Sequence, residues 1–183
     1  MIKISRKSFT KTLCALTNVD EETLQAIGAN LRKDGLVSFG GREAGFRHLN
    51  LSDATNFLLG LLATENPGQV SKVVRVVSHL KSKDGVYLGD AVAAILADPD
   101  TAGKVEYISV FRNSGKAVIG WSRSVFPGNY GERDLRQDVF SPEGADMEMF
   151  GMIVEAKLTR DVLNSIILEI HKAEKSGKIL NLK

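Results

Sequence analysis

The chain has 183 residues and a formal net charge of +2, and 43% of its residues are hydrophobic while 25% are charged. This apolar content is enough for a buried core and excludes the disordered and fibrous classes. The nearly balanced charge argues against strong nonspecific binding to nucleic acid, because dedicated binders are usually more basic.

The first predicted element is a short amphipathic helix over residues 6–17, followed by a tight turn. Its apolar side chains recur at helical spacing at Phe9, Leu13 and Leu16. Asn18 tolerates the left-handed conformation that a sharp turn needs. Asp20 is a natural N-cap for the next helix, so the pattern predicts a helix-turn-helix.

The second helix is expected to follow directly and to end at Gly35, a residue type favoured after the last helical turn. Its predicted buried stripe is Leu24, Ile27 and Leu31. Two short strands are predicted next, over residues 36–39 and 46–49, joined by the glycine-rich residues 40–45. This hairpin would be the wing of a winged helix-turn-helix.

Such a module inserts its second helix into the major groove of double-stranded DNA. Side chains off the apolar stripe would face the groove, where amides of Gln25 and Asn30 can read adenine and wing arginines can hold phosphates. The predicted DNA-binding residues are therefore Thr23, Gln25, Asn30, Lys33, Arg42 and Arg47. The alternative is a plain packing module, since Glu21 and Glu22 put carboxylates where a DNA-binding helix usually meets phosphate.

Helices are expected to continue after the wing. Ser52 is a predicted N-cap, and Asn66-Pro67 combines a cap with a proline at the first helical position. Asp84-Gly85 and Asp98-Pro99 are turn signals that end helices. The predicted helices cover residues 53–64, 67–83 and 89–97.

The character of the sequence changes after residue 98. Residues 105–111 and 116–121 predict a β-hairpin, and residues 122–146 predict a long surface excursion because they contain several Gly and Pro. Residues 149–158 read as a third strand. A final helix is expected to be capped by Thr159 and ended by Gly177, with an apolar stripe of Val162, Leu163, Ile166, Ile167 and Ile170.

The predicted fold class is therefore α+β. A helical, winged helix-turn-helix-like domain over residues 1–98 precedes a small antiparallel sheet with a C-terminal helix over residues 104–183. The last apolar stripe, together with Phe111, Ile119 and Trp121 of the hairpin, predicts a symmetric homodimer. The alternative is that these side chains form the core of their own domain.

The block LRKDGLVSFGGREAGFRHLNLSDATNFLLGLLAT resembles a group of uncharacterised bacterial prophage and phage proteins. The resemblance rests on a helix ending in LR-x-x-GL, a GGR turn and a capped leucine-rich helix. The matching positions are Leu31, Arg32, Gly35, Leu36, Gly40, Gly41, Arg42, Ser52, Asp53, Leu58, Leu59 and Leu62. It implies a helix-turn-helix-like module from a mobile element and implies no particular activity.

Signatures of catalysis and metal binding are absent from the sequence. The three histidines, His48, His79 and His171, have no metal-binding spacing, and Gly40-Gly41 lacks the Lys-Ser/Thr of a phosphate loop. We expect no enzyme and no cofactor. Cys14 is the only cysteine, and neither a secretory signal nor a membrane-spanning run is visible, so we expect a cytoplasmic protein without membrane contact.

Two functions from different classes follow. The first is a DNA-binding protein of a phage or mobile element, acting in transcription regulation. The second is a protein-binding factor, such as an inhibitor of a host or defence complex, in which the helix-turn-helix is scaffold.

Overall fold

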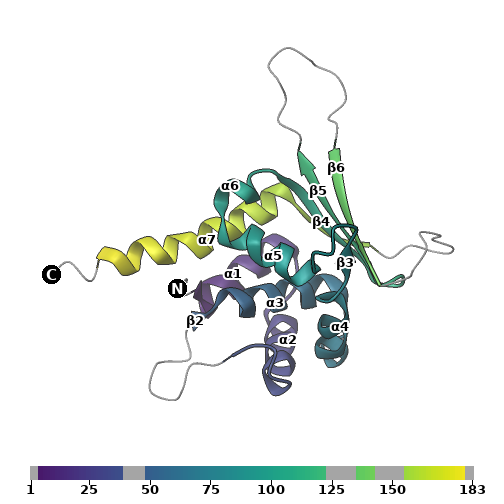
Figure 1. The fold of residues 1–183 in the computed structure, drawn as a ribbon. Coiled ribbons are helices and arrows are strands. Elements are labelled where there is room, and N and C mark those ends of the chain that lie inside the picture. Colours follow the sequence, from purple (N-terminus) through teal and green to yellow (C-terminus); the bar gives the residue numbers. More distant parts are fainter. Residues whose placement is uncertain (1–3, 39–47, 123–134, 143–154, 180–183) are drawn as a thin grey trace, which may run out of the picture.

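The computed structural model of the protein describes residues 4–38, 48–122, 135–142 and 155–179, with helices on one side and a sheet on the other (Figure 1). In chain order the elements are β1 (Ile4–Ser5), α1 (Arg6–Thr17), α2 (Glu21–Lys33), β2 (His48–Leu49), α3 (Leu51–Ala63), η1 (Pro67–Gln69), α4 (Val70–Val77), β3 (Lys81–Ser82), α5 (Leu88–Ala97), α6 (Pro99–Ala102), β4 (Val105–Phe111), β5 (Lys116–Ser122), β6 (Leu135–Ser141), β7 (Glu155–Thr159) and α7 (Arg160–Ile179). The predicted α+β class is confirmed.

The helix-turn-helix segment follows its local signals. Asn18 adopts a φ of 55°, the left-handed conformation that turns the chain between α1 and α2. Asp20 caps α2 by accepting a hydrogen bond from the backbone N–H of Thr23 at 2.7 Å. At the other end Gly35 has a φ of 73°, and the backbone N–H of Leu36 bonds to the carbonyl of Leu31. The predicted turn, cap and helix end are all confirmed.

The predicted wing hairpin is wrong where it can be compared with the structure. Residues 36–38 form no strand, because side chains of α3 take their backbone groups: Asn56 donates to the carbonyl of Leu36, and Asp53 accepts from the N–H of Ser38. β2 pairs instead with β1, antiparallel, so that Leu49 lies opposite Ile4. Residues 39–47, with the predicted wing tip, lie outside the described residues.

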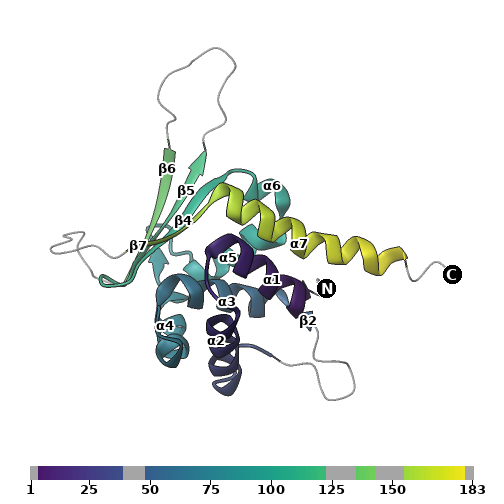
Figure 2. The ribbon, with the colours of Figure 1, turned by 180° about the vertical axis from the view of Figure 1, so that it is seen from behind.

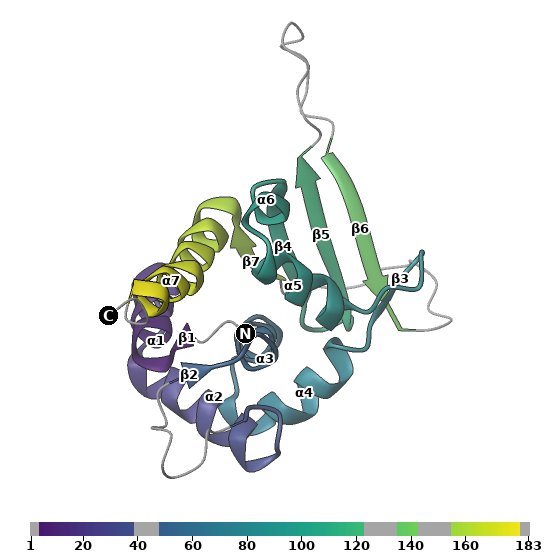
Figure 3. The same cartoon turned by 60° about the vertical axis from the view of Figure 1, so that its left-hand side comes forward.

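Helix α3 lies at the centre of the helical part, with α1, α2, α4, α5 and α7 arranged around it (Figure 3). Most of its side chains are buried, which explains its nearly continuous apolar sequence. Its N-cap is Asn50 and not the predicted Ser52. Asn50 and Asp53 bond reciprocally to each other's backbone N–H, a capping box that Ser52 cannot form.

The predicted helix over residues 67–83 is shorter than expected. It begins at the capped Asn66-Pro67 as a 3-10 turn, continues as α4 and ends at Val77. The chain then reverses through Gly85, whose φ is 80°, and the N–H of Ser82 bonds to the carbonyl of Val86. This reversal makes β3 an edge strand of the sheet, and the predicted helix after it, α5, begins at Leu88.

The sheet has the strand order β3-β6-β5-β4-β7, and neighbouring strands are antiparallel. The predicted hairpin is confirmed as β4 and β5, turned at Gly115 with a φ of 62°. Within the long surface excursion predicted over residues 122–146, the structure has a strand that was not predicted: β6 pairs with β5 from Ala117 to Ser122. Residues 123–134 and 143–146 lie outside the described residues. The sequence of β6 is too polar to predict a strand. Arg136 and Gln137 are exposed, while Phe140 is buried.

The last strand and helix complete the core. β7 matches the end of the strand predicted over residues 149–158, whose first part lies outside the described residues. Helix α7 does not end at Gly177 but continues to Ile179. It packs along α1 and on the sheet (Figure 2). Four residues of its predicted stripe are buried in the core of the same protomer: Leu163, Ile166, Ile167 and Ile170.

The core is continuous across the predicted boundary near residue 98. Buried side chains of α1 to α5 and of the sheet with α7 belong to one cluster. Arg112 also ties the sheet to α3, since its Nε donates to the carbonyl of Leu62 at 2.9 Å. The separate domains over residues 1–98 and 104–183 stay a prediction.

Candidate nucleic-acid interface

The outward face of α2 carries two of the four helix residues predicted to contact DNA, Gln25 and Lys33. Its inward face packs on α1, α3 and α4 through Leu24, Ile27 and Leu31. The exposed residues on the opposite side are Glu21, Glu22, Gln25, Ala29, Arg32 and Lys33. Positions 22, 25, 29 and 33 lie three or four residues apart, so they form one stripe along the helix.

The N-terminal end of α2 is acidic, and its carboxylates accept hydrogen bonds from residues of the same helix. Asp20 accepts hydrogen bonds from the backbone N–H and the hydroxyl of Thr23, each at 2.7 Å. The backbone bond, followed by the hydroxyl bond, lowers the pKa of Asp20 below its ordinary value. The amide of Gln25 donates to Glu21 at 3.1 Å. Thr23 therefore serves as part of the cap, and one amide hydrogen of Gln25 is used within the helix.

Asn30 faces the protein interior on the side of η1 and α4. Its side-chain amide donates to the backbone carbonyl of Pro67 at 2.9 Å, and its backbone carbonyl accepts from the hydroxyl of Ser71 at 3.1 Å. These bonds hold α2 against the start of α4. In this structure the amide of Asn30 therefore joins two parts of the fold, and its role in reading bases stays a prediction.

The C-terminal end of the stripe is cationic. Lys33 is exposed in the last turn next to Arg32, where cations oppose the partial negative charge of the helix end. Arg75 of α4 reaches the same end and donates to the carbonyl of Asp34 at 2.7 Å. The C-terminal end of α2 therefore has three cationic residues near it, Arg32, Lys33 and Arg75.

A buried carboxylate fixes the chain on both sides of residues 39–47. Asp53 is only 3% exposed. Its Oδ1 accepts from the N–H of Ser38 at 2.7 Å, and its Oδ2 accepts from the hydroxyl of Ser38 at 2.8 Å and the N–H of Asn50 at 3.1 Å. We call Ser38, Asn50 and Asp53 the clamp. Sequence reasoning missed it, although an Asx residue followed three positions later by an acid is its local signal.

Arg42 and Arg47, the predicted phosphate contacts, come between Ser38 and Asn50 in the sequence and lie outside the described residues. Within the part of the chain that the structure describes, no group of His, Cys, Asp and Glu side chains is arranged to hold a metal ion. No described helix is both long and apolar enough to cross a membrane.

Comparison with known proteins adds no relative to this picture. No protein-family model matches the chain, and no curated protein or solved structure shows significant similarity to it.

Proposed function

We propose that the protein binds double-stranded DNA through the outward face of α2, as a regulator from a phage or mobile element. The observation that carries this proposal is the exposed stripe from Gln25 through Ala29 to Lys33, which leads to the cationic end of the helix. Ala29 in its middle presents little bulk, so a partner surface can approach the helix closely. Arg42 and Arg47 follow this end in the sequence, between the two sides of the clamp.

The expected roles divide along the helix. Gln25 would contact a base edge, because its amide both donates and accepts. Lys33, Arg42 and Arg47 would neutralise phosphates and fix the position of the helix on the duplex. Asn30 has no base-reading role in this proposal, since it holds α2 to η1.

The test is a selection of preferred sequences from a random duplex pool by the full chain. The proposal expects an enriched motif whose preference at one position is relaxed by Gln25→Ala. A pool that shows no enrichment would contradict sequence-specific binding. Lys83→Ala is a matched surface control, because Lys83 is an exposed lysine in the turn before α5 and is not part of α2.

The acidic first turn of α2 favours a second candidate function, that of a protein-binding factor. Glu21 and Glu22 are exposed where a groove-inserted helix would meet phosphate, and like charges there oppose DNA. A protein partner with a basic surface would instead complement them. Charge reversal of both residues separates the two: DNA binding should tighten in the first case, while a basic partner should be lost in the second.

A homodimer remains part of the DNA-binding proposal, because two recognition helices usually share a site. Helix α7 offers little apolar surface for a dimer interface, because most of its predicted apolar stripe is buried within the protomer. The solution mass of the full chain at micromolar concentration tests it. A monomer without DNA would restrict any pairing to the DNA-bound state.

A further inference from the structure

A cavity of about 590 Å³ lies where the end of α3, the η1–α4 segment and the β4–β5 turn meet. Its apolar wall consists of Val73, Val76, Val77, Val110 and Phe111. This volume is in the range of pockets that hold small organic ligands, which are mostly apolar with a few polar groups. The cavity lies on the opposite side of α4 from the contacts with α2, so it is distinct from the candidate DNA surface.

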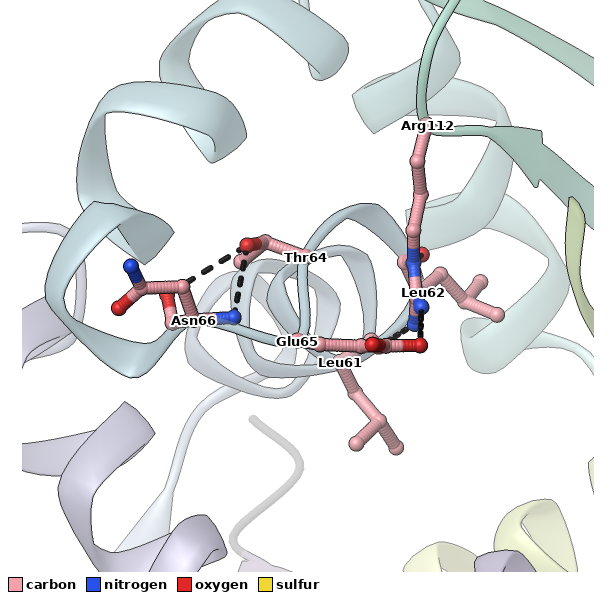
Figure 4. A network of polar contacts seen from close by, with 6 residues as sticks. All are labelled: Leu61, Leu62, Thr64, Glu65, Asn66 and Arg112. Carbon is pink, nitrogen blue, oxygen red and sulfur yellow. Dashed lines mark hydrogen bonds and ion pairs between the residues drawn. The ribbon is translucent and has the colours of Figure 1, made fainter. Parts of the chain in front are cut away.

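The polar groups on the side of the cavity where α3 ends already bond to one another. Arg112, just after β4, reaches the end of α3 (Figure 4). It pairs with the carboxylate of Glu65 and donates to the carbonyl of Leu62 at 2.9 Å. The carbonyls at a helix end carry partial negative charge and would otherwise attract a cation. Because the guanidinium of Arg112 occupies that place, this end of the cavity does not call for a cationic ligand.

Lys72 supplies a positive charge at the solvent-exposed edge of the cavity. It is exposed, lines the cavity and has no ion-pair partner among the described residues. One helical turn further, Val76 is 56% exposed, an unusual degree for a valine beside an apolar wall. A cation next to an apolar surface fits a ligand with an anionic head and a hydrocarbon body.

We propose that this cavity binds an amphipathic organic monoanion, a carboxylate attached to a hydrocarbon chain. The carboxylate lies at Lys72, and the chain lies along Val76 and Phe111. The lining charges agree with this class, since Lys72 and Arg112 outnumber the single acid, Glu65.

The ligand also regulates α2, and this second part rests on the proposed DNA-binding function. One wall of the cavity belongs to the same η1–α4 segment that holds α2 through Asn30, Pro67 and Ser71. Arg75, on α4, bonds to the backbone at the end of α2. A ligand that sets the spacing between α4 and the β4–β5 turn therefore biases the position of α2 relative to the rest of the protein.

The test for the ligand site is an amide NMR titration of the full chain with sodium octanoate. Octylammonium chloride and butyrate serve as probes of opposite charge and of shorter chain. The proposal expects octanoate to shift the amides of residues 64–66, 68, 69 and 110–115 at millimolar concentration. Lys72→Glu and Val76→Asn should each weaken octanoate roughly tenfold, while Lys83→Glu and Val86→Asn, at other exposed positions, should not.

Binding of octylammonium as strong as that of octanoate would overturn the assigned ligand class. Absence of octanoate shifts in a folded protein, shifts confined to other residues, or unchanged affinity in Lys72→Glu would overturn the site. Thermal melting of each variant establishes that it is folded, which is expected because Lys72 and Val76 are exposed.

The regulatory part is tested by measuring DNA affinity with and without octanoate. A change of roughly threefold or more, abolished by Lys72→Glu, supports the coupling. Octanoate binding without any change in DNA affinity overturns the coupling and keeps the ligand site. Failure to bind DNA under both conditions overturns the proposed function together with the coupling, while the NMR titration decides the ligand site independently.

Discussion

The two ends of α2 differ in charge and in how they are held. At the N-terminal end, Asp20 and Glu21 bond to residues of the same turn or the next, Thr23 and Gln25. At the C-terminal end, bonds from distant parts of the chain add to the local cap: Arg75 donates to the carbonyl of Asp34, and Asp53 accepts from the N–H of Ser38. The first end is stabilised locally, and the second is built into the fold.

This difference shows where a DNA contact is best supported. A polyanion is repelled by Glu21 and Glu22, whereas Arg32 and Lys33 attract it. A surface that must position charged groups also benefits from a rigid base. The C-terminal half of α2 has both properties, so we expect changes there to affect DNA binding more than changes at the N-terminal end.

The largest effect is expected from Asp53→Ala, which removes the clamp. The N–H groups of Ser38 and Asn50 and the hydroxyl of Ser38 would lose their acceptor, and a hydrogen bond to a charged group contributes about 1.5–3 kcal/mol. We expect a loss of about 3 kcal/mol in the free energy of unfolding, measured with urea. Asp90→Ala, at an exposed position in the first turn of α5, is the control and should cost far less.

The next effect is that of replacing Arg42 and Arg47 together with Ala. Loss of two phosphate contacts should weaken binding to every duplex about tenfold and reduce the salt slope by about 2. Fluorescence anisotropy with labelled duplexes at several salt concentrations measures both. The control is the pair Lys83→Ala and Lys104→Ala, and an unchanged slope in the arginine variant would remove residues 39–47 from the interface.

A smaller and sequence-dependent effect is expected at Gln25. Gln25→Ala should cost at least about 1 kcal/mol at a selected site and nothing on random DNA. Competition between the two duplexes measures this difference directly. Equal losses on both would mean that Gln25 contributes no base contact. Thr23→Ala should instead lower stability through the cap and leave the preference unchanged.

The smallest effect is expected on thermal stability at acidic pH, through the Asp20 cap at the N-terminal end of α2. Hydrogen bonds from Thr23 lower the folded-state pKa of Asp20, so its stabilising contribution is present above the ordinary carboxyl pKa and is lost as pH falls through the lowered value. Asp20→Asn keeps a capping side chain without a titratable group. Between neutral pH and pH ~3, the melting temperature of the wild type should therefore fall slightly more than that of Asp20→Asn. Parallel curves would contradict the role of the charged cap.

Local signals in the sequence predicted the parts of the fold that local interactions determine. Asn18, Asp20 and Gly35 specified the turn, the cap and the end of α2, and Gly115 lies in the predicted hairpin turn. Ser52 was a reasonable cap by residue type. Asn50 prevails because Asp53 lies three residues after it and completes the reciprocal bonds.

The errors arose where the partner of a segment lies far away in the sequence. β6 has polar outer residues and becomes a strand only by pairing with β5, and residues 36–38 lose strand character to side chains of α3. The same reason limits the site. The exposed stripe of α2 could be predicted from periodicity, but Asn30 bonds to Pro67, 37 residues later, which no local pattern indicates.

The salt dependence of DNA binding by the full chain tests the central claim most directly. If Arg32, Lys33, Arg42 and Arg47 engage phosphates, the logarithm of the binding constant should fall linearly with the logarithm of salt concentration, with a slope of about −3 to −4. Replacing Glu21 and Glu22 with Gln should strengthen binding without making the slope shallower. Absence of binding at low salt, or an affinity that does not change with salt, would contradict the account.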